Sequence, residues 1–372
     1  MIILHTTLKT NWEKALESGK FGFDAIKENG FIPCLKIEDV NAENFTSPSI
    51  RDNVILCIDT NKVDAEIKED GFHVNIYGMI DKKAILSAIT YTSDTSDKFI
   101  MNDELKDMMI LNDVLTRMDL KYESHQYFKD GSFSRTIFLN EKYVIKQNNP
   151  ALLKSEILFA EKSRHLKLQK MAYYDSDYRY IVYHYIPGEV MHTVEDFEDL
   201  LENVKEIISS YPAYNGPEFG KLCEPVSSWK DFLKEEVHDA SLVLKESFDF
   251  LPQVYAAIDT LNDYSFEKKL LHGDFGTHNF IKYQGKFNGA IDPIPTVGDP
   301  LYDLLFALLS NVDILPRIPL EYLYEIIDEP KEKIKAMFTV VLFSRLARCL
   351  NHHKADFDTY IDYWYANLGG NE

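Results

Sequence analysis

The residues of this chain whose types and spacing best suit a chemical task lie between positions 271 and 292. One carboxylate, Asp274, is followed five residues later by an amide, Asn279, and further on by a second carboxylate, Asp292. Metal-assisted phosphoryl transfer needs a group that orients the acceptor hydroxyl and takes its proton, together with oxygen ligands for Mg²⁺. We therefore predict Asp274 as the catalytic base and Asn279 and Asp292 as the metal ligands.

The segments on either side of this loop are typical of short strands. Apolar pairs stand at 270–271 and 280–281, directly before and after the loop. A further strand pattern runs over 287–291 and ends on Asp292, 18 residues after Asp274. Strands at these positions would hold the three predicted site residues on rigid elements.

Three more polar residues near the loop are predicted to support it and not to react. His272 is expected to brace the loop through hydrogen bonds of its ring. Asp299 stands where it can cap a strongly apolar helix, and Asp303 lies one turn further along that helix.

Upstream, the sequence carries a lysine and a glutamate in the order that kinases use to hold nucleotide phosphates. Lys146 ends an apolar strand pattern, and the helical stretch after it contains Glu156 and Glu161. In kinases a strand lysine contacts the α- and β-phosphates and is held by a glutamate of the next helix. We predict the pair Lys146 and Glu156, with Glu161 as the alternative.

Two further segments complete a predicted ATP site. A turn between strands carries Gly131, Ser132 and Ser134, whose N–H groups and hydroxyls could approach phosphate oxygens. Later, a strong strand pattern is broken by a Pro-Gly pair, where a two-lobed kinase passes between lobes and its backbone pairs with adenine. We assign His184 and Ile186 to that contact. Alone, these segments would be an ordinary hairpin and an ordinary strand, and the downstream loop supports the nucleotide interpretation.

The pattern of helices and strands predicts an α+β protein with several units. Its 372 residues and 45% hydrophobic content suffice for more than one core. We expect a small α+β domain over 1–91, a polar linker over 92–104, a kinase N-lobe over 105–186, and a mainly helical C-lobe with the acceptor site over 187–372. The fold class is therefore a two-lobed protein-kinase-like fold with an additional small N-terminal domain.

Composition limits the partners of the chain. A net charge of -20 argues against nucleic acid and suits a cationic or neutral small molecule. More than half of that charge lies in 193–263, as a solvated helical surface or as an acidic wall that concentrates a cationic acceptor. No apolar run is long enough for a membrane span, so we expect a cytoplasmic protein. The scattered cysteines predict reduced thiols without zinc or disulfides: Cys34, Cys57, Cys223 and Cys349.

Three motifs in the second part of the chain resemble the signature of the aminoglycoside phosphotransferase and choline kinase superfamily. They are His272-Gly273-Asp274 with Asn279, Ile291-Asp292-Pro293, and Gly298-Asp299-Pro300 with Tyr302-Asp303. Details of the first motif, with Ser134-Arg135 and 143–146, are most similar to hygromycin phosphotransferases, which phosphorylate a sugar hydroxyl of an aminocyclitol antibiotic. The resemblance extends from about 105 to 372 and implies the kinase-like fold, with ATP and Mg²⁺ as cofactors.

The N-terminal part resembles a family of small proteins of unknown function that is related in fold to ADP-ribosyl transferases. The shared pattern includes His5 near the start and an Ile-Tyr-Gly near the end. Where that family usually has two further histidines, this chain has Pro33 and Asn75. We therefore expect a structural or regulatory role for this domain.

Together these features predict an ATP- and Mg²⁺-dependent O-phosphotransferase for a small molecule, with an aminoglycoside or aminocyclitol antibiotic as the preferred acceptor and antibiotic resistance as the outcome. A metabolic kinase for an amino alcohol or a sugar is an alternative. A nucleotide-binding pseudokinase that acts as a binding module is another. The sequence leaves the oligomeric state and the choice between ATP and GTP open.

Overall fold

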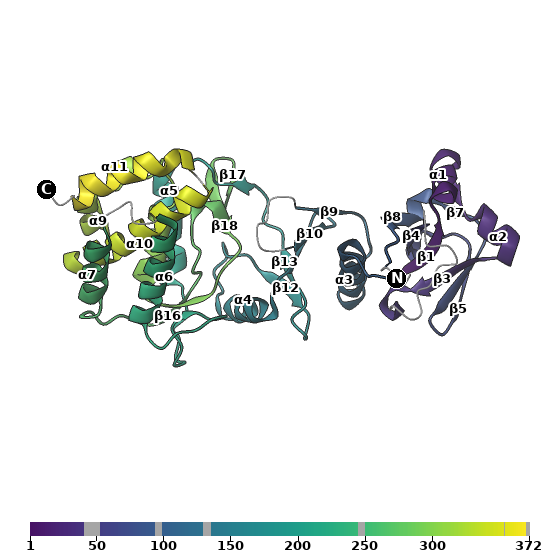
Figure 1. Ribbon diagram of the computed structural model, residues 1–372, viewed down its shortest axis with the longest axis horizontal. Helices are drawn as coiled ribbons and strands as arrows, with labels where there is room; N and C mark the ends of the chain where they lie inside the picture. Colours follow the sequence, from purple (N-terminus) through teal and green to yellow (C-terminus); the bar gives the residue numbers. More distant parts are fainter. Residues whose placement is uncertain (41–52, 94–98, 129–134, 245–249, 353, 370–372) are drawn as a thin grey trace. The chain divides into compact units, whose positions relative to one another are not determined.

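The computed structural model describes residues 1–40, 53–93, 99–128, 135–244, 250–352 and 354–369. The chain divides into two compact units, 1–124 and 125–372 (Figure 1). Both units mix helices and sheets, as the sequence predicts. No helix of the described residues is both long enough and apolar enough to cross a bilayer.

The first unit is built on a six-stranded antiparallel sheet. The strand order is β5 (Glu66–Asp70), β6 (His73–Tyr77), β3 (Ile32–Lys36), β1 (Ile2–Leu8), β4 (Asn53–Asp59) and β8 (Ile85–Thr90). The short strands β2 (Lys20–Phe21) and β7 (Ile80–Asp81) form a second pair. Every residue of β4 is buried, which indicates that both faces of the sheet are covered at this strand.

Helices α1 (Lys9–Ser18), α2 (Phe23–Asn29) and α3 (Asp103–Arg117) complete the first unit. Helix α3 begins at the side chain of Asn102, which accepts a hydrogen bond from the Leu105 N–H at 2.9 Å. Its Asn112 accepts one from the Ile2 N–H at 2.7 Å, so the helix is tied to β1. The buried side chains of α3 include Leu105, Met108 and Leu111.

This placement of α3 differs from the predicted domain limits. The sequence suggested a linker over 92–104 and assigned the helix after it to the kinase N-lobe, whereas the division into compact units falls after Ser124. Part of the supposed linker is packed, because the rings of Tyr91 and Phe99 are both buried and lie 5.3 Å apart. Helical periodicity indicates an apolar face but does not indicate which sheet it covers.

The second unit begins with a five-stranded antiparallel sheet. Its order is β12 (Met171–Tyr174), β13 (Ile181–His184), β11 (Tyr143–Gln147), β10 (Arg135–Leu139) and β9 (His125–Tyr127). Helix α4 (Pro150–Lys162) packs on this sheet through Leu153 and Ile157, which meet Ile181 and Tyr183. Asn149 caps the helix, since its side chain accepts from the Ala151 N–H, and Pro150 suits the first turn.

The rest of the second unit is mainly helical. Its α-helices are α5 (Phe197–Ser209), α6 (Trp229–Leu244), α7 (Leu251–Leu261), α8 (Pro300–Leu308), α9 (Leu320–Ile326), α10 (Lys331–His352) and α11 (Phe357–Leu368). Helix α10 runs through the middle of this group, against α6, α7 and α8 (Figure 1). Phe338 and Phe343 of α10 are fully buried, and this lobe holds the largest core of the protein.

Two small sheets carry the loops that matter for the site. One consists of β14 (Glu189–Val190), β17 (Phe280–Tyr283) and β18 (Lys286–Ala290), and the other of β15 (Gly220–Lys221), β19 (Thr296–Gly298) and β16 (Lys269–Leu271). The loop over 272–279 joins β16 to β17, and the loop over 291–295 joins β18 to β19. Since each sheet receives one end of each loop, the two loops must lie side by side.

The close packing of β19 on α6 leaves no room for a side chain at Gly298. A Cβ atom at this position would lie 2.0 Å from Cζ3 and 2.4 Å from Cε3 of the buried Trp229 ring. Gly298 is therefore required by packing.

We expect Gly298→Ala to lower the free energy of unfolding by about 1–3 kcal/mol, because the methyl group must displace the Trp229 ring. Urea unfolding measures the change. Combining it with Trp229→Phe, which shortens the opposing ring, should cost less than the sum of the two single changes. A Gly298→Ala protein as stable as the wild type would contradict this packing argument.

Candidate active site

The carboxylate of Asp274 is held by three donors from two parts of the lobe. Oδ2 accepts from Asn279 Nδ2 at 2.9 Å and from His278 Nε2 at 3.1 Å, both in the same loop. Oδ1 accepts from Arg348 Nη1 at 2.9 Å, on α10. The Asp274 side chain keeps 17% of its surface exposed, so it is fixed and still reachable.

These neighbours determine the protonation of Asp274. Burial alone would raise the pKa of the carboxyl, but hydrogen bonds and electrostatic attraction from His278 and Arg348 hold it well below its usual range. The group is therefore an anion at neutral pH. An anionic carboxylate can accept a hydrogen bond from a hydroxyl, as an orienting base must.

Asn279 is oriented by the same loop. Its Nδ2 also donates to the Asp274 carbonyl at 2.9 Å, so its Oδ1 is the atom that could bind a cation. The Asn279 carbonyl accepts from the Ile291 N–H at 2.9 Å, which brings the following residue, Asp292, to the same place. Asp292 has φ of 63°, an uncommon conformation for a residue other than glycine, and its side chain is 49% exposed.

Lys146 of β11 lies between two carboxylates. Its Nζ is 2.8 Å from Glu156 Oε1 and 2.5 Å from Asp292 Oδ1. Burial by itself lowers the pKa of Lys146, but the two carboxylates outweigh it and raise that pKa overall. Tyr183 donates to the other oxygen of Glu156 at 3.2 Å. The structure thus pairs Lys146 with Glu156, while Glu161 is exposed on the surface of α4.

The loop is braced from below by buried groups. His272 Nε2 donates to the Ile291 carbonyl at 3.0 Å, and burial lowers the pKa of its ring to about 4, so it is neutral. Asp303 accepts from the Gly273 N–H at 3.2 Å and from the Tyr211 hydroxyl at 2.8 Å. Burial raises the pKa of Asp303 to about 7.

Backbone geometry makes Gly273 special. Its φ is +79°, and a Cβ atom there would lie 2.0 Å from the Ile294 carbonyl oxygen. The absence of a side chain lets the two loops approach each other at this point.

The Phosphotransferase enzyme family matches residues 126–330, more than half of the chain. The chain belongs to this family. No protein among the curated ones matches it significantly.

Several solved structures of aminoglycoside phosphotransferases are similar to this chain. Aminoglycoside phosphotransferase APH(4)-Ia is 16% identical, with 72% of this chain and 100% of that chain covered and a TM-score of 0.50. A thermostable mutant of it in ternary complex with AMP-PNP and hygromycin B is 17% identical, with coverages of 69% and 99% and a TM-score of 0.48. The GDP complex of wild-type aminoglycoside 2'-phosphotransferase-IIIa is 16% identical, with coverages of 69% and 96% and a TM-score of 0.46.

For the remaining predicted nucleotide contacts of this phosphotransferase, the structure shows only contacts within the protein or does not describe the residue. The His184 N–H donates to the Lys170 carbonyl at 2.8 Å, and the His184 carbonyl accepts from Gln169 Nε2 at 3.2 Å. Ile186 places its side chain against Gly289 of β18. Their contact with adenine stays a prediction. The predicted phosphate-turn residues lie outside the described residues: Gly131, Ser132 and Ser134.

Two residues of the site, Arg348 and His278, were not predicted from the sequence. The ion pair between Lys146 and Asp292 was not predicted either, although both residues were. Arg348 could have been suspected, because it interrupts the apolar pattern of a long helix, and a charge in such a place is rarely buried without a partner. His278 lies four residues after Asp274, and its ring meets the Asp274 carboxylate because the loop between them is tight.

Asp299 also behaves as predicted. Its Oδ1 accepts from the Leu301 N–H at 3.0 Å and so caps α8, and its Oδ2 lies 3.0 Å from Lys333 Nζ. Helix α8 is thereby anchored to α10. This anchor positions Asp303 beneath the loop.

A resident cation of the phosphotransferase would be held by few protein ligands. Within the described part of the chain, no group of three or more His, Cys, Asp or Glu side chains is placed to hold a metal. Asn279 Oδ1 and the half-exposed Asp292 fit Mg²⁺, which usually takes one or two carboxylates and completes its shell with waters and phosphate oxygens.

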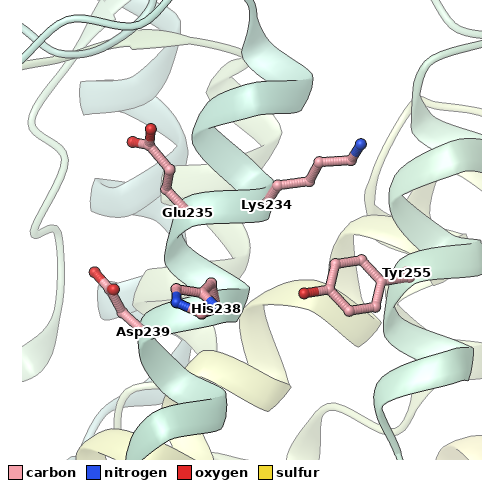
Figure 2. A pocket seen from close by; sticks show the side chains of 5 residues that line it. All are labelled: Lys234, Glu235, His238, Asp239 and Tyr255. Carbon is pink, nitrogen blue, oxygen red and sulfur yellow. The ribbon is translucent and has the colours of Figure 1, made fainter.

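A cavity of about 510 Å³ opens between α6 and α7. Figure 2 shows Tyr255 projecting from α7 toward His238 of α6. The other residues that line the cavity are Lys234, Glu235 and Asp239. None of the predicted site residues that the structure describes borders this cavity. We therefore do not assign it to phosphoryl transfer.

We expect Asp303→Asn to lower the free energy of unfolding by about 1–3 kcal/mol, because one of the donors that face the carboxylate loses its acceptor. The same substitution should also reduce the dependence of the free energy of unfolding on pH. Since folding raises the pKa of Asp303 from 3.8 to about 7, its stabilising contribution is complete below the unfolded value and is lost as pH rises through the folded value.

Urea unfolding at stepped pH values between these two pKa values measures both effects. Asp328→Asn, on the exposed surface, is the control for loss of one carboxylate. A slope of stability against pH that is the same in Asp303→Asn as in the wild type would contradict the assignment.

Proposed function

We propose that this phosphotransferase transfers the γ-phosphoryl group of ATP, with Mg²⁺, to a hydroxyl of a small molecule, and that its preferred acceptor is an aminoglycoside or aminocyclitol. The observation that carries the proposal is the anionic Asp274, held by three donors beside Asn279 and next to the loop of Asp292. In this proposal the two adjacent loops together supply a base and two oxygen ligands.

The chemical step follows from these roles. The acceptor hydroxyl donates a hydrogen bond to Asp274, and its oxygen forms a bond with the γ-phosphorus while the bond to the bridging oxygen breaks. ADP leaves with that electron pair. The hydroxyl proton passes to Asp274 late, because a loose transition state requires little early deprotonation. A weak base is therefore sufficient, which agrees with the low pKa of Asp274.

The other residues orient the nucleotide. Lys146 presents a fixed ammonium, steadied by Glu156, to which phosphate oxygens can bind. Asn279 and Asp292 would hold Mg²⁺, which offsets the negative charge that develops on the phosphates. His184 and Ile186 are proposed to pair with adenine, and the turn with Gly131, Ser132 and Ser134 to cover the phosphates.

Two observations favour a cationic acceptor. The segment over 193–263, which includes α5, α6 and α7, carries over half of the net charge of -20. Related enzymes of the same fold were solved in complexes with kanamycin or with hygromycin B. An acidic surface raises the local concentration of such amines and speeds their arrival.

We propose a structural or regulatory role for the first unit, which would be related to the ADP-ribosyl transferase fold. His5, the histidine that it shares with the family it resembles, is buried, and its Nδ1 lies 2.7 Å from the Pro33 carbonyl. Burial lowers the pKa of His5, so its ring is a neutral core group. A packed histidine of this kind supports a structural use.

The proposal is tested by incubating the full chain with ATP, Mg²⁺ and a panel that contains kanamycin, hygromycin B, simple amino alcohols and sugars. Phosphorylated antibiotic, together with reduced susceptibility of a host that makes the protein in its cytoplasm, would support it. Phosphorylation of an amino alcohol or sugar alone would favour a metabolic kinase. ATP binding without any product would favour a pseudokinase.

We expect Asp274→Asn to lower kcat by about 100-fold or more while the Kd for ATP stays within about two-fold, because the amide keeps the shape but cannot take the proton. Steady-state kinetics and equilibrium ATP binding measure the two quantities. Turnover equal to that of the wild type would exclude Asp274 as the base.

We expect Asp292→Ala to weaken ATP binding in the presence of Mg²⁺ by about ten-fold or more, because a charged oxygen ligand is lost. Calorimetric titration of ATP with and without Mg²⁺ measures the effect. Asp328→Ala, an exposed carboxylate of the same unit, is the matched control. If Mg²⁺ dependence is the same as in the wild type, Asp292 is not a metal ligand.

A further inference from the structure

Arg348 lies at the centre of the candidate site, although no motif of the sequence includes it. It projects from α10, its Nη1 is 2.9 Å from Asp274 Oδ1, and its Nη2 is 3.9 Å from Glu236 Oε2 on α6. The guanidinium carbon is 4.5 Å from the centre of the Phe306 ring of α8. Arg348 therefore joins the catalytic loop to three different helices.

These contacts fix the plane of the guanidinium. An aromatic face on one side and carboxylates at two nitrogens leave little freedom of rotation. Glu236 is itself held, because its Oε1 lies 2.6 Å from Lys221 Nζ on β15. Arg348 is thus held by contacts on several sides, although 32% of its side chain is exposed.

The hydrogen bonds of Asp274 show where a substrate hydroxyl can bind. A carboxylate has about four acceptor positions, two on each oxygen. Asn279 and His278 fill the two on Oδ2, and Arg348 takes one on Oδ1. The remaining position is on Oδ1, next to the guanidinium. A hydroxyl that donates to Asp274 is therefore placed beside Arg348.

We propose that Arg348 is a positioning residue of the phosphoryl transfer, which holds Asp274 Oδ1 so that a single direction is left for the hydroxyl of the acceptor. The inference rests on the proposed function. Arg348 acts through Asp274, and its loss leaves the base present but free to turn. A small misplacement of a catalytic group is enough to cost about a hundred-fold in rate.

Hydrolysis of ATP in the absence of an acceptor tests this without knowledge of the natural substrate. Water then takes the place of the hydroxyl: its oxygen bonds to the γ-phosphorus, the bond to the bridging oxygen breaks, ADP leaves with the electron pair, and a water proton goes to Asp274. We expect Arg348→Ala to lower the kcat of this reaction by about 10- to 100-fold with KM for ATP within about two-fold.

Chemical rescue separates positioning from packing. Millimolar guanidinium, far below denaturing concentrations, should restore a large part of kcat in Arg348→Ala, since the free cation can occupy the vacated place. Arg348→Lys should recover less, because an ammonium is a point charge without the planar fork.

Arg345→Ala is the matched control. Arg345 lies one turn earlier on α10, and its Nε donates to the Tyr360 hydroxyl at 3.2 Å. It is the same residue type on the same helix and is more deeply buried than Arg348, but it lies on the side of α11. Guanidinium should not change its kcat, even if its Tm falls.

Two results would overturn the inference alone: an Arg348→Ala enzyme with the kcat of the wild type, or one whose kcat and Tm fall together without rescue by guanidinium. Failure of the proposed function looks different. Wild-type protein that hydrolyses no more ATP than Asp274→Asn would reject phosphoryl transfer itself, and the role of Arg348 with it.

Discussion

The two loops that carry the candidate site are tied together through His272. Its carbonyl accepts from the Ile294 N–H at 2.9 Å, and its ring donates to the Ile291 carbonyl at 3.0 Å. Because these bonds run from the loop of Asp274 to the loop of Asp292, backbone geometry sets the spacing of the two carboxylates. Together with the pairing of the two small sheets, this tie brings the predicted base near Asp292.

Around this tie, each carboxylate faces a cation from a distant element. Lys146 reaches Asp292 from the five-stranded sheet, and Arg348 reaches Asp274 from α10. Lys146 is buried, and burying an ammonium is costly unless it is paired, so its carboxylate partners are required there. Both contacts connect a distant element of the second unit to the two loops. The same interactions therefore contribute to packing and, under the proposed function, also to the chemistry.

The order of residues along the chain is enough to predict those parts of the site that depend on local structure. It predicts the pair of Lys146 and Glu156 and the cap of α8 by Asp299, and the structure contains both. The contact of Arg348 with Asp274 spans 74 positions and arises only when α10 packs beside the loop. No local pattern encodes such a contact, and for the same reason the sequence did not reveal which sheet α3 covers.

The attachment of α3 to the first unit has a practical consequence for work on the second unit alone. A shortened chain that starts at 92 keeps α3, and one that starts at 105 loses only its cap and first two residues, but both remove β1, to which Asn112 ties the helix. The apolar face of α3, with Leu105, Met108 and Leu111, would then meet water. Such a face promotes aggregation, so a soluble catalytic fragment should begin beyond Ser124.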